Sequence, residues 1–251
     1  MLARMALGTR WHEQDLLAFD LETTGVDRFS DVPVSYALLA VRAGAVVDRD
    51  ASLVDPGRDI PLGASAVHGI TTERARREGI PLGIAVRHIA DVLLDASLHG
   101  VPVVGMKLDY DLTMVDSCYR RETGRGLGDD GFRGPVLDAL VIDRHVDRYR
   151  RGKRTLVDLC AEYKVTIERA HDASADAKAA ADVLLALCER YPELCGLSPA
   201  ELYASQQGWH REWTQSFAAW RCRKGLAPIA DEEAEWPVAF AGRKVDAQAA
   251  V

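Results

Sequence analysis

The chain has 251 residues, enough for one large domain and an extension, with 48% hydrophobic and 27% charged residues, as in ordinary globular proteins. A net charge of −7 argues against a protein that coats nucleic acid electrostatically, but not against an enzyme that meets a few phosphates. No apolar run is long enough to span a membrane, and five cysteines without a C-x-x-C pair predict a reducing cytoplasmic location rather than a disulfide framework or a zinc site.

The first predicted element is a buried strand over residues 16–22, L-L-A-F-D-L-E, after a loose leader over residues 1–14. Because side chains alternate across a strand, Asp20 and Glu22 share one face and the apolar side chains between them point to a core. Two adjacent carboxylates repel each other, and Mg²⁺ or Mn²⁺ would remove that penalty. For this pair alone, a strand end whose acids face water is the simpler interpretation.

Two further apolar runs, residues 34–42 and 45–54, flank Gly44 and predict a hairpin, so that the first three strands are mostly antiparallel. His68 follows in a turn beside Gly69, where a hydrogen-bonding surface role is the simpler interpretation. A helix T-E-R-A-R-R-E, capped by a threonine, comes next.

Helical spacing predicts a helix over residues 82–98, followed by a short strand at 101–104. A helix over about 109–121 carries Asp111 in its first turn, where complementarity to the helix dipole explains an acid without any function. Residues 136–140 predict a fifth strand.

A run of basic residues over 144–154 predicts either a solvated face or a contact to phosphates, and neither interpretation is favoured over the other. An amphipathic helix at 156–163 precedes an Ala-rich helix for which Asp172 is the candidate N-cap. His171 then lies just before this helix and Asp176 in its first turn, so both can face one site; a capped core helix with an exposed histidine is the alternative.

The capping box S-P-A-E at 198–201 starts a long helix to about Gly225, and residues after 226 predict an ordered patch followed by a tail. The helix carries one stripe of large apolar side chains, Leu202, Trp209, Trp213, Phe217 and Trp220. Packing on the main domain is the favoured interpretation of this stripe; a face for a partner or for stacked bases is the other.

Four acids and one histidine thus stand in a fixed order: Asp20, Glu22, Asp111, His171 and Asp176. The motifs that contain them, F-D-L-E-T-T-G, L-D-Y-D-L and H-D-A-S-A-D, resemble those of the DEDD superfamily of 3′–5′ exonucleases, in the branch with a catalytic histidine. V-H-G-I-T, V-L-D-A-L and G-K-R-T-L-V-D-L-C are similar to segments in relatives of the epsilon proofreading subunit of bacterial DNA polymerase III. The resemblance covers about residues 15–190, and the complete set is specific where no single motif is.

Two positions depart from the family pattern. Met106-Lys107 stands where family members commonly carry His-Asn, which puts a loop hydrogen bond in doubt and leaves Lys107 able to reach a substrate phosphate or a carboxylate. Gly63 stands where an acidic residue is often found, so one contact to the 3′ nucleotide is missing or supplied elsewhere.

The resemblance implies an α/β, RNase H-like fold: a mixed five-stranded sheet flanked by helices, with the exonuclease domain over residues 15–195 and a helical extension and tail over 196–251. It implies release of nucleoside monophosphates from the 3′ end of DNA by two-metal-ion hydrolysis with Mg²⁺ or Mn²⁺. By resemblance, Asp20 bridges both ions. Glu22 and Asp176 hold the ion that activates water, and Asp111 serves the second.

The resemblance also assigns His171 as general base, and the unperturbed histidine pKa of about 6.5 suits proton transfer near neutral pH. It places Thr23 and His68 in the pocket of the terminal nucleotide, and Lys107 is the further candidate for substrate binding.

Three alternatives stay open beside DNA proofreading or repair on a single-stranded 3′ end. An RNA-trimming enzyme would use the same chemistry, because tolerance of the 2′-OH is not visible in the sequence. A nucleic-acid-binding module without catalysis is disfavoured, since all five catalytic positions are present. Docking of the Trp209–Trp220 helix onto a DNA polymerase or a repair protein is compatible with catalysis.

Overall fold

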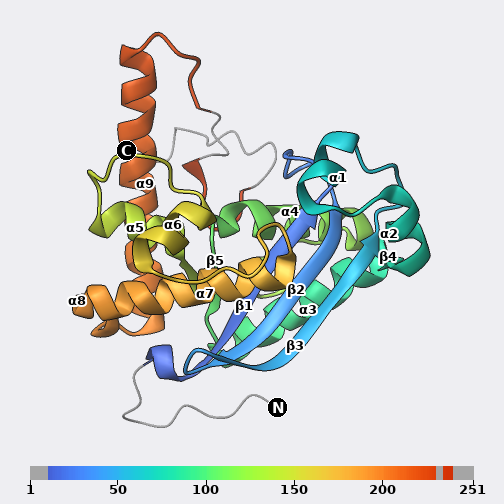
Figure 1. Cartoon of the computed structure of the whole chain (residues 1–251), viewed down its shortest axis with the longest axis horizontal. Coiled ribbons are helices and arrows are strands. Elements are labelled where there is room, and N and C mark those ends of the chain that lie inside the picture. The colour runs from blue at the N-terminus through green and yellow to red at the C-terminus, as the bar shows by residue number, and fades with distance from the viewer. Residues whose placement is uncertain (1–10, 230–233, 240–251) are drawn as a thin grey trace.

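The computed structural model describes residues 11–229 and 234–239, in which a central sheet lies between two layers of helices (Figure 1). In chain order the elements are η1 (Trp11–Glu13), β1 (Asp15–Thr23), β2 (Pro33–Arg42), β3 (Ala45–Asp55), α1 (Leu62–His68), α2 (Thr72–Glu78), β4 (Ile80–Pro81), α3 (Leu82–His99), β5 (Val103–Gly105), α4 (Leu108–Thr123), β6 (Val136–Asp138), α5 (Ala139–Val146), α6 (Leu156–Tyr163), α7 (Ala173–Arg190), α8 (Pro192–Cys195) and α9 (Pro199–Arg223).

The strands form one mixed sheet in the order β4-β3-β2-β1-β5-β6. The antiparallel pairing of β1, β2 and β3 confirms the predicted hairpin, while β5 and β6 run parallel to β1. The predicted count of five strands is wrong by one, because β4 pairs with the end of β3; two residues carry no alternating pattern that would reveal a strand. The parallel strands β1, β5 and β6 bring their carboxyl ends to the same edge of the sheet, where α/β proteins place their ligands.

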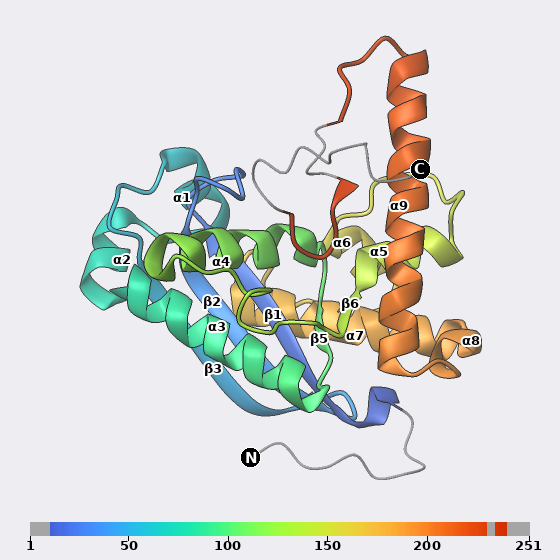
Figure 2. The ribbon, with the colours of Figure 1, turned by 180° about the vertical axis from the view of Figure 1, so that it is seen from behind.

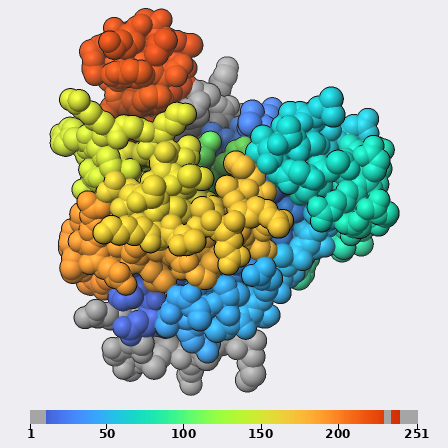
Figure 3. All heavy atoms as spheres, in the orientation of Figure 1, coloured from blue at the N-terminus to red at the C-terminus, as the bar shows by residue number. Residues whose placement is uncertain are grey.

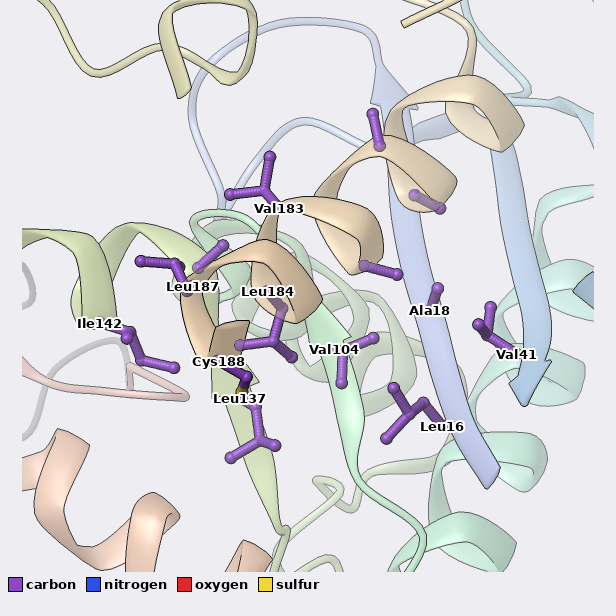
Figure 4. Packing of buried hydrophobic residues seen from close by; sticks show 14 of the residues in the cluster. Leu16, Ala18, Val41, Val104, Leu137, Ile142, Val183, Leu184, Leu187 and Cys188 are labelled. Atoms are coloured by element: carbon purple, nitrogen blue, oxygen red, sulfur yellow. The ribbon is translucent and has the colours of Figure 1, made fainter. Parts of the chain in front are cut away.

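Both faces of β1 are buried, which explains the unbroken apolar run over residues 16–19. Leu16 and Ala18 pack beneath α7, in the cluster that Figure 4 shows, whereas Leu17 and Phe19 pack with α3 and α4 on the opposite face (Figure 2). The helix α7 meets the sheet largely through alanines, whose small side chains let its backbone lie close to the strand that carries Asp20.

Four helices of the described chain occupy segments for which no helix was predicted, namely η1, α1, α5 and α8. The loop expected before Gly69 contains α1. The fifth predicted strand ends at Asp138 instead of residue 140, because the Asp138 carboxylate accepts the N–H groups of Leu140 and Val141 and thereby starts α5.

The basic run over residues 144–154 has a structural core that neither predicted interpretation included. Asp143 is fully buried, and its carboxylate pairs with Arg150 (2.7 Å) and Arg154. The Tyr163 hydroxyl donates a third hydrogen bond to it (2.7 Å). These contacts fix the loop between α5 and α6, and within the run Arg148, Arg151 and Lys153 are exposed.

The helix α9 rises beside α5, and its upper part extends beyond the body (Figure 1). The predicted packing is confirmed for two tryptophans: Trp209 stacks on His145 with ring centroids 3.8 Å apart, and Arg144 lies 3.5 Å over the Trp213 ring. Trp220, near the end of the helix, is 42% exposed.

The two ends of the described chain also pack against the domain. Trp11 is buried and donates a hydrogen bond to the Leu194 carbonyl (3.4 Å), so the described part of the expected leader is not loose; residues 1–10 lie outside the described residues. Residues 234–239 run between α4 and α9 (Figure 2), where the Ala239 N–H donates to Thr113 Oγ1 (2.9 Å). This is the predicted ordered patch, and the tail expected after it lies outside the described residues. The boundary expected after residue 195 stays a prediction.

Within the described residues, no helix combines the length and the apolar character that crossing a membrane requires.

Candidate active site

The carboxyl end of β1 presents two acids to the helix that covers it. Asp20 and Glu22 lie on the same face of the strand as Ala18, the face that packs beneath α7, and Glu22 is only 9% exposed. The loop that follows turns sharply at Gly25, where a Cβ atom would lie 2.4 Å from Asp31 Oδ2. This contact explains why a glycine follows the two threonines.

The N-terminus of α7 brings the other half of the site to these acids. Asp172 caps the helix by accepting the Ala175 N–H (3.2 Å), as predicted. The preceding residue, His171, has a left-handed backbone (φ 64°), and its N–H donates to Asp176 Oδ2 (3.1 Å). One ligand atom from each of His171, Asp176 and Glu22 lies within 4.8 Å of the others, so the structure brings these three predicted residues together.

Asp111 enters the site from the first turn of α4, where it is buried. A residue that the sequence reasoning passed over fixes this helix start: Asp138 accepts the N–H groups of Lys107 (3.1 Å) and Leu108 (2.9 Å) as well as those that begin α5. The Asp138 N–H donates in turn to Gln206 Oε1 on α9 (2.8 Å). A carboxylate in the middle of a predicted strand was the only sequence signal for this role.

The four acids share one electrostatic environment. Burial, followed by the charges of Asp111, Asp176 and Glu22, raises the pKa of Asp20 well above its usual range. Burial and the charge of Asp176 raise the pKa of Glu22 to about 7. Burial is also the main reason that the pKa values of Asp111 and Asp176 are raised. Acids on β1, α4 and α7 thus repel one another in one cluster.

This cluster fits divalent metal ions on its own chemistry. Among the described residues the buried Asp176 Oδ1 atom has no hydrogen-bond partner, which is costly for a carboxylate oxygen unless a cation binds it. The donors are mainly carboxylate oxygens, the hard ligands that suit Mg²⁺ or Mn²⁺. A bound cation would also remove the mutual repulsion that raises the pKa values.

The three residues predicted to contact the substrate lie around the acids, but their side chains differ in the hydrogen bonds that they already form. His68 is the last residue of α1, and its Nδ1 accepts the Ile70 N–H (3.1 Å). Burial, and then the charge of His171, lowers the pKa of His68, so the two histidines lie near the same site. The Thr23 hydroxyl is engaged with the Gly25 carbonyl (2.7 Å) and the Tyr110 hydroxyl (2.9 Å). Its expected role in binding a nucleotide stays a prediction, as do the roles of the other site residues.

Lys107 lines a cleft of about 570 Å³ that is formed by the start of α4, α5 and α9. Its backbone is left-handed (φ 60°) and its ammonium group lies 5.5 Å from the centre of the Tyr110 ring. Arg28, Arg144 and Trp213 also line this cleft. From the sequence, Arg144 belonged to the basic run that could meet phosphates and Trp213 to the stripe that could stack bases, whereas Arg28 was not singled out. Only the fold places the three beside Lys107.

Figure 3 shows the surface hollowed between the yellow segment before α7 and the cyan α1, with green atoms on the floor. These are the segments that carry His171 and His68. A substrate can therefore reach the acids from solvent.

The raised pKa of Glu22 predicts that the metal-free protein loses stability as the pH rises. Its pKa is about 7 in the folded protein and near 4.5 ordinarily, so between these values the folded state holds a proton that the unfolded state has released. The free energy of unfolding therefore falls with rising pH in this window, by about 3 kcal/mol over its whole width. Denaturant unfolding in EDTA at about pH 5.5 and about pH 8 measures the change.

Glu22→Gln is the matched variant, since it keeps the side-chain size and cannot ionise. Its stability should fall less between the two pH values, and Mg²⁺ should recover stability at the higher pH only in the unmodified protein. Equal pH dependence in the two proteins would contradict the prediction.

Comparisons with known proteins agree with this geometry. The family model described as "Exonuclease" matches residues 17–184, well over half of the chain. The chain is 27% identical over 184 residues to the PolC-type DNA polymerase III of Lacticaseibacillus paracasei and 25% identical over 175 residues to that of Bacillus subtilis. These matches cover 73% and 69% of this chain but only 12% and 11% of the polymerases, so the chain spans a small part of the length of these relatives.

Solved structures show the same fold. Escherichia coli exonuclease I in complex with a dA16 oligonucleotide aligns with a TM-score of 0.62 at 18% identity, over 82% of this chain and 45% of that one. Exonuclease X in complex with 5′ overhanging duplex DNA aligns with a TM-score of 0.55 at 18% identity, over 76% of this chain and 99% of that one.

Proposed function

This chain belongs to the exonuclease family whose model matches residues 17–184, and from that premise we propose that it removes nucleoside monophosphates from the 3′ end of single-stranded DNA with two divalent ions, Mg²⁺ or Mn²⁺. The observation that carries the proposal is the meeting of four mutually repelling acids from β1, α4 and α7 beside one histidine. When bound, the ions supply an activated water and neutralise charge on the leaving oxygen. Asp20, Glu22, Asp111 and Asp176 would hold them.

His171 has the position of a general base. Its side chain is exposed at the rim, and its backbone is tied to Asp176, so the imidazole stays beside the acids while remaining open to water and substrate. A neutral imidazole can take the proton from the attacking water as the bond to phosphorus forms. The proton then leaves to solvent, because the ring is exposed.

The cleft beside Lys107 supports a single strand as substrate. Arg28, Arg144 and Lys107 can meet phosphates, and Trp213 offers an aromatic ring among them. Exonuclease I has been solved in complex with single-stranded oligonucleotides, which supports DNA over RNA here, and the PolC-type relatives support a role in DNA proofreading or repair. The free cysteines support a cytoplasmic location.

A docking role for α9 is the second candidate. Phe217 and Trp220 stack on each other with centroids 5.7 Å apart, on the part of the helix that extends beyond the body, and Trp220 is partly exposed. A DNA polymerase or repair protein is the partner proposed for this end of the stripe. Docking there would leave the acids accessible.

Degradation of 5′-labelled single-stranded DNA and RNA of the same sequence tests the proposed activity. In Mg²⁺ or Mn²⁺ the DNA should give a ladder that shortens from the 3′ end, and EDTA should abolish it. The RNA should be degraded more slowly, because its 2′-OH must be accommodated in the terminal pocket.

A 3′-phosphorylated DNA serves as the matched control, since it has the same sequence with a blocked end. Faster degradation of RNA would replace DNA repair by RNA trimming as the function. No cleavage of any substrate under these conditions would favour the binding module.

A further inference from the structure

Three metal-ligating side chains meet at the opposite end of α7 from the acids: His12 of η1, Cys188 of α7 and Cys195 of α8. One ligand atom from each lies within 4.8 Å of the others, and together with Glu189 they line a cavity of about 320 Å³. Cys188 follows Asp176 by twelve residues, so this cluster lies roughly 18 Å along the helix from the acids. It is a separate site.

The local fold holds the three side chains in place. The buried indole of Trp11 is bonded to the Leu194 carbonyl, which sets the neighbouring His12 against α8. Pro192 starts α8 directly after α7, and the chain folds back so that Cys195 Sγ donates to the Cys188 carbonyl (3.4 Å). The cluster is therefore built from residues that the packing already orients.

One atom of the cluster lacks a partner. The Nδ1 atom of His12 is buried and forms no hydrogen bond within the described residues. A buried ring nitrogen without a partner costs free energy, and coordination of a metal ion is one way in which histidine recovers it.

We propose that His12, Cys188 and Cys195 bind one Zn²⁺ ion, with the Glu189 carboxylate or a water as fourth ligand. Two sulfurs and an imidazole nitrogen form the donor set that Zn²⁺ favours, unlike the oxygen-rich cluster at the other end of α7. Zn–S and Zn–N bonds of about 2.3 and 2.0 Å require the ligand atoms to close to roughly 3.5 Å from one another, which small side-chain rotations can achieve.

Such an ion would join the segment before β1 to the corner between α7 and α8. The two thiols would release their protons on binding, and the bound ion would stabilise the folded state. The composition argued against a zinc site because the cysteines form no C-x-x-C pair. His12 lies more than 170 residues before Cys188 and Cys195, and only the fold brings the three together.

Titration of the reduced, metal-stripped full-length protein with Co²⁺ tests the site directly. We expect one equivalent to bind with a near-ultraviolet thiolate-to-cobalt charge-transfer band, which Zn²⁺ then abolishes by displacement. Carrying Asp20→Asn in all samples weakens binding at the acids, which in any case offer no thiolate. Cys195→Ser should lose the band, and His12→Ala should weaken Co²⁺ binding at least tenfold.

Cys222→Ser is the matched control, because Cys222 is exposed on α9 and should leave the band unchanged. Circular dichroism verifies that the variants are folded. Absence of the band in the unmodified chain, or its persistence in Cys195→Ser, would refute the zinc site. Neither result would touch the proposed exonuclease activity, which is measured separately in Mg²⁺.

Discussion

Asp20→Asn should lower kcat/KM for hydrolysis of single-stranded DNA by about 10³-fold or more in Mg²⁺. The substitution keeps the shape of the side chain but removes the charge at the centre of the acidic cluster, where burial and four neighbouring acids raise its pKa. If Asp20 is the shared metal ligand proposed above, its loss removes several kcal/mol of transition-state stabilisation, and about 4 kcal/mol corresponds to three powers of ten. Initial rates on the 5′-labelled oligonucleotide measure the loss.

The same variant should be more stable than the unmodified protein in EDTA. Asp20 is repelled by Asp111, Asp176 and Glu22, and a neutral amide ends that repulsion, so Tm should rise. Asp59→Asn removes one charge from an exposed position and is the control for the change in net charge. Undiminished activity would disprove the site, whereas a lower Tm in EDTA would disprove the electrostatic account of it.

His171→Asn should lower kcat by about 10²–10³-fold with little change in KM. Asparagine tolerates the left-handed backbone that residue 171 adopts and cannot act as a base near neutral pH, so the loss reports on the imidazole. Single-turnover experiments with saturating enzyme separate this chemical step from product release. Their rate should fall by the same factor.

His99→Ala is the matched control, because it removes an exposed histidine at the end of α3. Its rate should equal that of the unmodified protein. If His171→Asn hydrolyses DNA at the unmodified rate, another group accepts the proton and the assignment of His171 fails.

The sequence pattern predicted the parts of the site that depend on local rules. The alternation of β1 put Asp20 and Glu22 on one face, and the Asp172 cap placed Asp176 at the start of α7. These rules act over a few residues, so they can be read from neighbouring positions.

The remaining features depend on contacts between distant segments. Asp138 was not predicted to position Asp111, because that role needs hydrogen bonds to N–H groups some thirty residues earlier. Of the predicted stripe on α9, Leu202 is buried, but the polar residues that share its buried face, Gln206, His210 and Thr214, were missed. Gln206 is buried because the β6 backbone offers hydrogen-bond partners to its amide, and periodicity does not reveal such partners.

The bond between Gln206 and Asp138 ties α9 to the part of the chain that the family model matches. Gln206 accepts the Asp138 N–H and donates to the Val136 carbonyl, so α9 supports the backbone at Asp138. The Asp138 carboxylate in turn binds the first N–H groups of α5 and of α4, the helix that carries Asp111. A chimera that contained only the family-matched residues 17–184 would lack α9 and its hydrogen bonds to β6. A fragment designed to keep these contacts should therefore extend past Arg223, the last residue of α9.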